Sequence, residues 1–263
     1  MDLGIRGRTA IVAAASSGLG KATAMELAAE GARVSINARN EEELRRAADE
    51  IHSVTGAEIL PIVGDVTNEN HVRRLVLETR NTFGSVDILV ANAGGPPAGF
   101  FDDFTAEHYR EALELNLIST INLCREAVPH MRERHWGRIV AITSIAAKQP
   151  VDNLILSNTS RAGVLGFMKS LSQQLASDGI TVNTLCPGYH STERLKSLAA
   201  STAQKEGVTV EEVYARWAAS TPMNRIGDPK EFAAVAAFLC SERASYLTGA
   251  VIQVDGGAYR ALY

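Results

Sequence analysis

Cysteine is scarce in this sequence. The three cysteines, Cys124, Cys186 and Cys240, lie far apart and lack the short spacing of metal-ligand pairs. So few cysteines in a chain of 263 residues are typical of a reducing compartment. We therefore expect a cytoplasmic protein without a metal site.

Long apolar runs and an excess of charge of one sign are also missing. The N-terminus lacks the apolar core of a signal peptide, and no run is long enough to span a membrane. The net charge of −4 gives no electrostatic reason to expect nucleic acid or an anionic membrane as partner. With 46% hydrophobic and 21% charged residues, the composition fits one large α/β domain better than two small ones.

Short apolar segments rich in β-branched residues alternate with longer helical patterns. In chain order the segments read TAIVAA, RVSINA, EILPIV, VDILVA, RIVAIT and TVNTLC, with VIQVD near the C-terminus. This alternation predicts a doubly wound, seven-stranded parallel sheet with helices on both faces, a three-layer α/β/α arrangement. Ligands of such sheets bind at the carboxyl ends of the strands, here near the switch between the first and fourth strands.

No stretch rich in proline, glycine or serine divides the chain, so we expect a single domain over residues 1–263. The one irregular section, residues 189–228, is polar and helical in pattern and follows the sixth strand. An insertion beside the carboxyl ends of parallel strands often covers a substrate. We favour a substrate lid over a plain surface excursion.

The segment AASSGLG, residues 14 to 20, connects the first strand to a helix. Small residues let a backbone approach a phosphate, and a helix N-terminus offers free N–H groups and a positive dipole end. Small residues also serve merely to pack a helix on a strand. Because a strand precedes the segment and a helix follows it, dinucleotide binding is the favoured interpretation.

A second segment, LSNTSRAG, places Ser157 and Arg161 four residues apart, on one face of a predicted helix. Serine, asparagine and threonine favour helix starts, and arginine usually reaches solvent. The segment alone does not separate helix punctuation from a functional pair.

Together these motifs resemble the short-chain dehydrogenase/reductase family, of the 3-oxoacyl-acyl-carrier-protein reductase type, over nearly the whole chain. The family's loop pattern is Thr-Gly-x-x-x-Gly-x-Gly; Gly18 and Gly20 match its last two glycines, whereas Ala13 and Ala14 replace the threonine and the first glycine. The resemblance implies a Rossmann-like fold and an oxidoreductase that uses NAD(P). The implied phosphate-loop residues are Ala14, Ser16, Ser17, Gly18, Leu19 and Gly20.

The end of the second strand bears on the choice of cofactor. NAD sites usually hold the ribose with a carboxylate there, whereas NADP sites use a cation for the 2′-phosphate. The corresponding residue is Ala38, and Arg39 follows it. We therefore expect NADP(H), with NAD(H) less favoured.

Further segments resemble the family's cofactor contacts. The resemblance implies that GDVTN contacts adenine, that ANAG lines the cleft and braces the sheet, and that PGYHST is the loop that closes over the nicotinamide. TGAVIQVDGG resembles the C-terminal strand and turn of the family. The residues implied by these segments are Asp65, Val66, Asn92, Ala93, Gly94, Pro187, Gly188 and Thr192.

The implied catalytic positions are Asn116, Ser144, Ser157 and Arg161. Asparagine is a poor residue for a helix interior, so Asn116 either has a polar task or faces solvent. Ser144 matches the family's catalytic serine.

Counting 13 residues from Ser144 reaches Ser157, where the family has the tyrosine of Tyr-x-x-x-Lys, and Arg161 stands at the lysine. Arginine can still bind ribose hydroxyls, but it does not release a proton. Serine is too short to replace the phenol, so a water or another acid must act. Tyr189 and His190 are nearest in sequence, although we expect the tyrosine to pack on the lid and the histidine to face solvent.

Three functions follow. The first is an NADP-dependent oxidoreductase that transfers hydride between nicotinamide and a carbonyl or alcohol, with Arg161 also binding the cofactor. The second is an NADP(H)-binding sensor or partner subunit without turnover, and the third is non-redox chemistry on the same scaffold. The resemblance also implies a homodimer or homotetramer, which helices near 105–134 and 157–177 could form with their apolar stripes.

Overall fold

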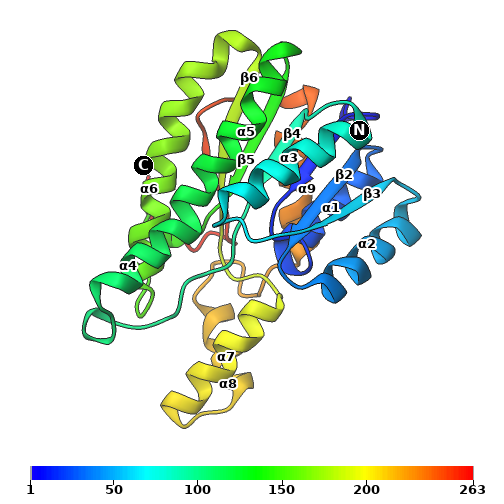
Figure 1. Ribbon diagram of the computed structural model, residues 1–263. Helices are drawn as coiled ribbons and strands as arrows, with labels where there is room; N and C mark the ends of the chain where they lie inside the picture. The colour runs from blue at the N-terminus through cyan, green and yellow to red at the C-terminus, as the bar shows by residue number, and fades with distance from the viewer. Residues whose placement is uncertain (1, 263) are drawn as a thin grey trace.

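The strands of the protein form one parallel sheet. The computed structural model describes residues 2–262. Its strands are β1 (Thr9–Val12), β2 (Arg33–Ala38), β3 (Ile59–Val63), β4 (Ile88–Ala91), β5 (Gly137–Ile142), β6 (Ile180–Pro187) and β7 (Val251–Val254). Their order is β3-β2-β1-β4-β5-β6-β7, so the winding reverses between β1 and β4 (Figure 1). The predicted Rossmann-like sheet and its switch point are confirmed.

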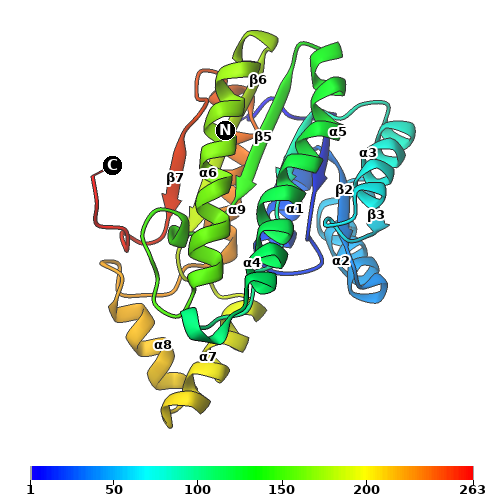
Figure 2. The same ribbon diagram turned by 60° about the vertical axis from the view of Figure 1, so that its left-hand side comes forward.

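Helices cover both faces of the sheet. They are α1 (Gly18–Ala29), α2 (Glu41–Thr55), α3 (Glu69–Phe83), α4 (Ala106–Leu113), α5 (Ser119–Glu133), α6 (Ile155–Leu175), α7 (Glu193–Glu206), α8 (Val210–Ala219) and α9 (Pro229–Leu239). A π-helical turn, η2 (Glu114–Ile118), joins α4 to α5. Helices α1, α2 and α9 lie on one face and α3, α5 and α6 on the other (Figure 2). Short 3₁₀ turns complete the chain: η1 (Phe101–Asp103), η3 (Ile145–Ala147), η4 (Ala176–Asp178) and η5 (Glu242–Ala244).

The central strands are apolar on both sides because both faces are covered. Neighbouring residues of β1 show this, since Ile11 and Val12 are fully buried in two different hydrophobic clusters. A strand turns successive side chains to opposite faces, so one short apolar run supplies both cores. This explains why the strands read as continuous apolar segments in the sequence.

Residues 189–228 leave the sheet after β6. Helices α7 and α8 project beyond the carboxyl ends of the strands (Figures 1 and 2). They carry a small apolar cluster of their own, formed by Ala199, Ala203 and Val213. The helical pattern predicted for this segment is therefore present at the end of the sheet where ligands bind.

No helix within residues 2–262 is long and apolar enough to cross a bilayer. Cys124, Cys186 and Cys240 are buried and free.

Candidate functional site

A cavity of about 560 Å³ opens at the carboxyl ends of the strands. Segments that follow β1, β2, β3, β4, β5 and β6 line it, together with α6 and the start of α7. Every site residue expected from the sequence lines this cavity except Asn116, which lies behind it. The fold thus gathers residues from most of the chain at the switch between β1 and β4.

Within residues 2–262, no side chain caps the free N–H groups at the start of α1. Its N-cap residue, Ser17, makes no side-chain cap hydrogen bond, and the first turn carries no acidic residue. By contrast, α2, α3, α7, α8 and α9 are capped by the side chains of Asn40, Asn68, Thr192, Thr209 and Asp228. An uncapped N-terminus that faces a cavity is suited to a phosphate.

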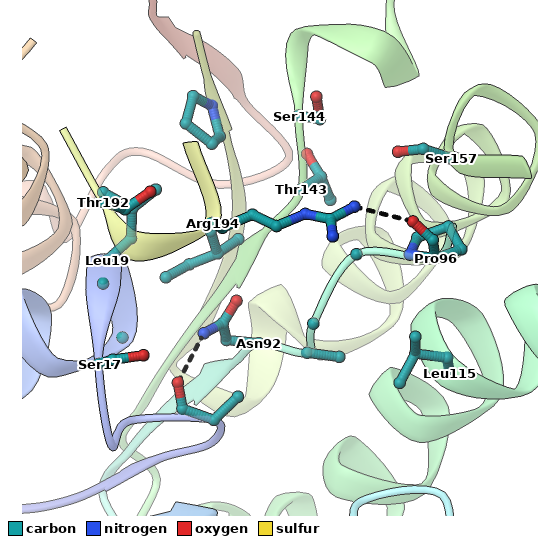
Figure 3. A pocket seen from close by; sticks show the side chains of 18 of the residues that line it. Ser17, Leu19, Asn92, Pro96, Leu115, Thr143, Ser144, Ser157, Thr192 and Arg194 are labelled. Atoms are coloured by element: carbon teal, nitrogen blue, oxygen red, sulfur yellow. Dashed lines mark hydrogen bonds between the residues drawn. The ribbon is translucent and has the colours of Figure 1, made fainter. Parts of the chain in front are cut away.

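The loop before α1 is held in an unusual shape. Ala14 has a φ of 48°, in the left-handed region that alanine rarely adopts. The Asn92 amide, after β4, donates hydrogen bonds to the carbonyls of Ala13 and Ala14 at 3.3 and 3.2 Å. Figure 3 marks the second of these with a dashed line. A side chain at Gly20 would place its Cβ 2.4 Å from the Ala14 oxygen. The loop therefore requires glycine at position 20 and tolerates alanine at position 14 under strain.

Arg39 marks the far end of the cavity, after β2. Its side chain is 78% exposed, and Nη1 lies 3.9 Å from Oδ2 of Asp65. Asp65 also accepts hydrogen bonds from the backbone and hydroxyl of Thr67. Glu43, on the first turn of α2, is a lining residue that the sequence motifs did not indicate. An exposed ion pair at this separation contributes little, so Arg39 is free to move toward a ligand.

Asn116 is placed by the π-helical turn η2. Its side chain is buried, and Nδ2 donates to the carbonyl of Gly94 at 3.0 Å. Its Oδ1 accepts a hydrogen bond from the hydroxyl of Ser160, on α6, at 3.0 Å. The extra residue of a π turn rotates a helix locally and recurs at functional sites. Of the two interpretations that the sequence left open, the buried polar task is the one observed.

Two serine hydroxyls face the cavity from β5 and α6. Ser144 follows β5, and its Oγ accepts a hydrogen bond from the backbone of Ala146 at 3.1 Å, which leaves its proton free to donate. Ser157, on the first turn of α6, is 7% exposed, and its hydroxyl makes no hydrogen bond within residues 2–262. Both lie near Thr143 in the view of the pocket (Figure 3).

Arg161 is buried beneath this part of the cavity. Its Nη1 donates to the carbonyls of Thr143 and Ile142 at 2.6 and 3.4 Å, and its Nη2 donates to that of Gly94 at 3.4 Å. It forms no ion pair with a carboxylate of residues 2–262. Burial, with the neighbouring Arg194, lowers the pKa of Arg161 to about 10, so it remains a cation at neutral pH. Ser157 and Arg161 therefore both face the interior, and a role at the helix start alone does not explain them.

Tyr189 and His190 follow β6. The Tyr189 ring stacks on Trp217 of α8, with centroids 5.0 Å apart, so the tyrosine packs within the segment 189–228. The expectation that His190 faces solvent is wrong, because it is 5% exposed. Its ring packs edge-on against Phe232 of α9, and its Nδ1 lies 3.3 Å from the carbonyl oxygen of Gly188. An isolated β-bridge joins His190 to Gly227, so the two ends of the segment 189–228 lie side by side.

Burial makes His190 a pH-sensitive element of stability. Desolvation lowers its pKa below 6.5, and the carbonyl of Gly188 and the charges of Glu231, Asp228 and Asp255 only partly offset this. The unfolded chain takes up the proton near pH 6.5 and the folded protein at lower pH, so the unfolding free energy falls as pH drops below 6.5. We expect a loss of up to about 1 kcal/mol per pH unit, and a shallower slope in His190→Asn. Urea unfolding of both proteins between pH 8 and pH 5 measures it; parallel curves would contradict it.

Arg194 is the residue of the site that the sequence motifs missed most clearly. It lies on the first turn of α7, which the Thr192 side chain caps. Its Nη2 donates to the carbonyl of Pro96 at 2.9 Å, across the cavity (Figure 3). The only feature of the sequence that could have indicated Arg194 is its positive charge within residues 189–228, the segment predicted to cover a substrate.

Comparison with known proteins decides the family. Residues 13–259 match the family model described as Enoyl-(Acyl carrier protein) reductase. The chain is 31% identical to the 3-oxoacyl-[acyl-carrier-protein] reductase FabG of Aquifex aeolicus, over 98% of this chain and 100% of that protein. The chain belongs to the short-chain dehydrogenase/reductase family.

Two further proteins are similar to this chain over nearly its whole length. The NADPH-dependent reductase BacG of Bacillus subtilis is 30% identical, over 97% of this chain and 99% of that protein. The crystal structure of L-sorbose reductase from Gluconobacter frateurii, complexed with NADPH and L-sorbose, superposes with a TM-score of 0.95 at 33% identity and covers 100% of both chains. The prediction of a short-chain oxidoreductase is confirmed at the level of the family.

Proposed function

We propose that the protein is an NADPH-dependent reductase that transfers hydride between the nicotinamide and a carbonyl or alcohol, with Ser157 and Arg161 in the places of the family's tyrosine and lysine. The observation that carries this proposal is the cavity itself. It joins the uncapped start of α1 to Ser144, Ser157 and Arg161. A nucleotide site and a polar, half-enclosed reaction site are therefore continuous.

The residues present fit NADPH. The free N–H groups of α1 would hold the pyrophosphate, and Arg39 would meet the 2′-phosphate. A Cβ added at Gly94 would meet no atom within 4 Å, so the cavity is open beside the β4 segment. BacG and the sorbose reductase structure, both named with NADPH, support the same cofactor. The other proposed contacts are those expected from the sequence, from Ala14 to Thr192, all of which line the cavity.

Bound NADPH supplies the hydride, and the chain supplies the polar groups around the carbonyl. The free hydroxyl protons of Ser144 and Ser157 can both point to a substrate oxygen. Serine is a weak acid, so we assign the proton to a water held between these hydroxyls. Asn116 acts as a positioning residue, because it fixes the Gly94 carbonyl that Arg161 also contacts.

Arg161 lines the cavity and would bind the nicotinamide ribose with the N–H groups that its backbone contacts leave unused. Its two terminal nitrogens already donate to three backbone carbonyls, which fixes the guanidinium in place. The same contacts favour a second candidate, an NADPH-binding sensor without turnover, because they leave Arg161 fewer donors for ribose. The nucleotide loop argues against non-redox chemistry on this scaffold.

The domain organisation, the oligomeric state, the cellular location and the partner are also proposed. Residues 1–263 would form one domain, with 189–228 as the substrate lid. A homodimer or homotetramer would form through the helices over 105–134 and 157–177. The protein would be cytoplasmic, and its partner would be a small molecule. The oligomer is tested by the mass in solution at micromolar concentration, where a monomer would contradict it.

The test of the function is oxidation of NADPH, followed at 340 nm, with a broad panel of ketones and aldehydes. We expect turnover of at least one carbonyl class and a large loss of it in Ser144→Ala. NADPH binding without turnover of any carbonyl would instead support the sensor.

Arg39→Asp should weaken NADPH binding by roughly 10- to 100-fold and leave NADH binding much less affected, because a charge-assisted contact to the 2′-phosphate is lost. Quenching of nucleotide fluorescence on titration measures both affinities. Arg46→Asp is the matched control: it makes the same charge change on α2 but lies outside the cavity. Equal affinity of the unmutated protein for NADPH and NADH would remove the basis of this prediction.

A further inference from the structure

Two guanidinium groups share the cavity wall at the reaction end. Arg161 lies beneath it on α6 and Arg194 extends into it from α7. Neither forms an ion pair within the part of the chain that the structure describes. The acidic residues that line the cavity, Glu43 and Asp65, lie at its other end beside α2 and after β3. The reaction end is therefore positively charged and lacks a compensating anion.

Arg194 is held in a defined direction. The Thr192 cap fixes the start of α7, and Nη2 donates to the Pro96 carbonyl at 2.9 Å. The guanidinium also lies against Gly95, where an added Cβ would be 3.3 Å from Nη2. In the pocket view it reaches toward Pro96 and Ser157 and away from Ser17 at the phosphate loop (Figure 3). Its direction matches a substrate contact, not a pyrophosphate contact.

Most of the hydrogen-bonding capacity of Arg194 is unused. A guanidinium has five N–H donors, and one hydrogen bond of Arg194 is formed within residues 2–262. Burial lowers the pKa of Arg194, and Arg161 and Arg194 repel one another. Partly desolvated cations without partners are costly, and an oxyanion with paired oxygens offsets that cost best.

We propose that Arg194 is a specificity-determining residue that binds an oxyanion, a carboxylate or phosphate, carried by the carbonyl substrate. This inference rests on the proposed function. Arg194, Ser144 and Ser157 line one end of the same cavity, so a single small molecule could contact all three. The preferred substrates are small oxo acids or phosphorylated ketones, and the neutral carbonyl group lies toward Ser144 and Ser157.

The test uses matched pairs of probes on the protein saturated with NADP⁺, so that no turnover is needed. Acetoacetate is compared with its methyl ester, and dihydroxyacetone phosphate with dihydroxyacetone, by calorimetric titration. At least one anionic probe should bind roughly 10- to 100-fold more tightly than its neutral partner. The two pairs separate a carboxylate site from a phosphate site.

Arg194→Gln should remove that preference and leave NADPH affinity unchanged. Lys196→Gln is the matched control, since it removes one positive charge from the same helix outside the cavity and should keep the preference. Equal binding within both pairs, or an Arg194→Gln variant that keeps the preference or loses NADPH instead, would overturn the inference. If the anion binds through Arg194 but no carbonyl is reduced, the proposed function fails and the inference stands. If neutral ketones are reduced and Arg194→Gln changes nothing, the proposed function stands and the inference about Arg194 fails.

Discussion

Replacing Gly20 by alanine should lower both the unfolding free energy and the affinity for NADPH. An added Cβ would lie 2.4 Å from the Ala14 carbonyl oxygen and 2.9 Å from Nδ2 of Asn92, and the nearer of these atoms belongs to the backbone. Overpacking of this kind costs about 1–3 kcal/mol, or roughly 2–4 °C in melting temperature per kcal/mol. The displaced loop should also bind NADPH about tenfold more weakly or worse, since each 1.4 kcal/mol of binding energy is a factor of ten.

Gly94→Ala provides the matched control for stability. It introduces the same methyl group into the wall of the same cavity, but no atom lies within 4 Å of the added Cβ. Thermal melting of the two variants without nucleotide should show a loss for Gly20→Ala and none for Gly94→Ala. Equal melting temperatures, together with unchanged NADPH affinity in Gly20→Ala, would mean that the loop adapts and that its geometry is not required.

The double replacement Ser157→Tyr with Arg161→Lys should raise the rate of ketone reduction. Residue 157 faces the cavity from the first turn of α6, and within residues 2–262 its hydroxyl makes no hydrogen bond that the phenol would break. A lysine at 161 stays close to the Thr143 carbonyl and lowers the pKa of the new phenol. A positioned general acid typically contributes 10²–10⁴ in rate, so we expect an increase in kcat of at least about tenfold.

The control for this pair is Ser157→Phe with Arg161→Lys, which fills the same space without a hydroxyl. Steady-state oxidation of NADPH with the carbonyl panel compares the two variants. A gain for tyrosine and none for phenylalanine would assign the gain to proton transfer. If the tyrosine variant binds NADPH normally and still reduces nothing, the chain is better described as a nucleotide sensor.

The sheet was predictable because its strands are buried on both faces. An apolar run such as that around Ile11 and Val12 must be covered on both sides, and the helical patterns between such runs provide the cover. The cofactor end was predictable for a related reason: Gly18 and Gly20 satisfy a local backbone requirement that depends only on a strand before and a helix after them. Local constraints of this kind can be predicted from a single sequence.

The reaction end depends on contacts that join distant segments. The burial of His190 depends on the packing of Phe232 and on the bridge to Gly227, about 40 residues away, and no local pattern indicates either. The π turn that directs Asn116 depends on its fit against α6. The direction of Arg194 depends on the carbonyl of Pro96 across the cavity. These features follow from tertiary packing, which periodicity and spacing do not encode.

In the nucleotide-free protein, no side chain within residues 2–262 caps the first turn of α1. Its amide hydrogens rely on water, so this turn should exchange them with solvent faster than the capped helices do, and it is a natural place for local opening. A bound dinucleotide would act as the missing cap and close that opening. Saturation at a hundred times the dissociation constant adds about 2.7 kcal/mol to the unfolding free energy. The lifetime of the folded chain would then depend on the supply of nucleotide, and loss of cofactor would expose the protein to proteolysis as well as stop its chemistry.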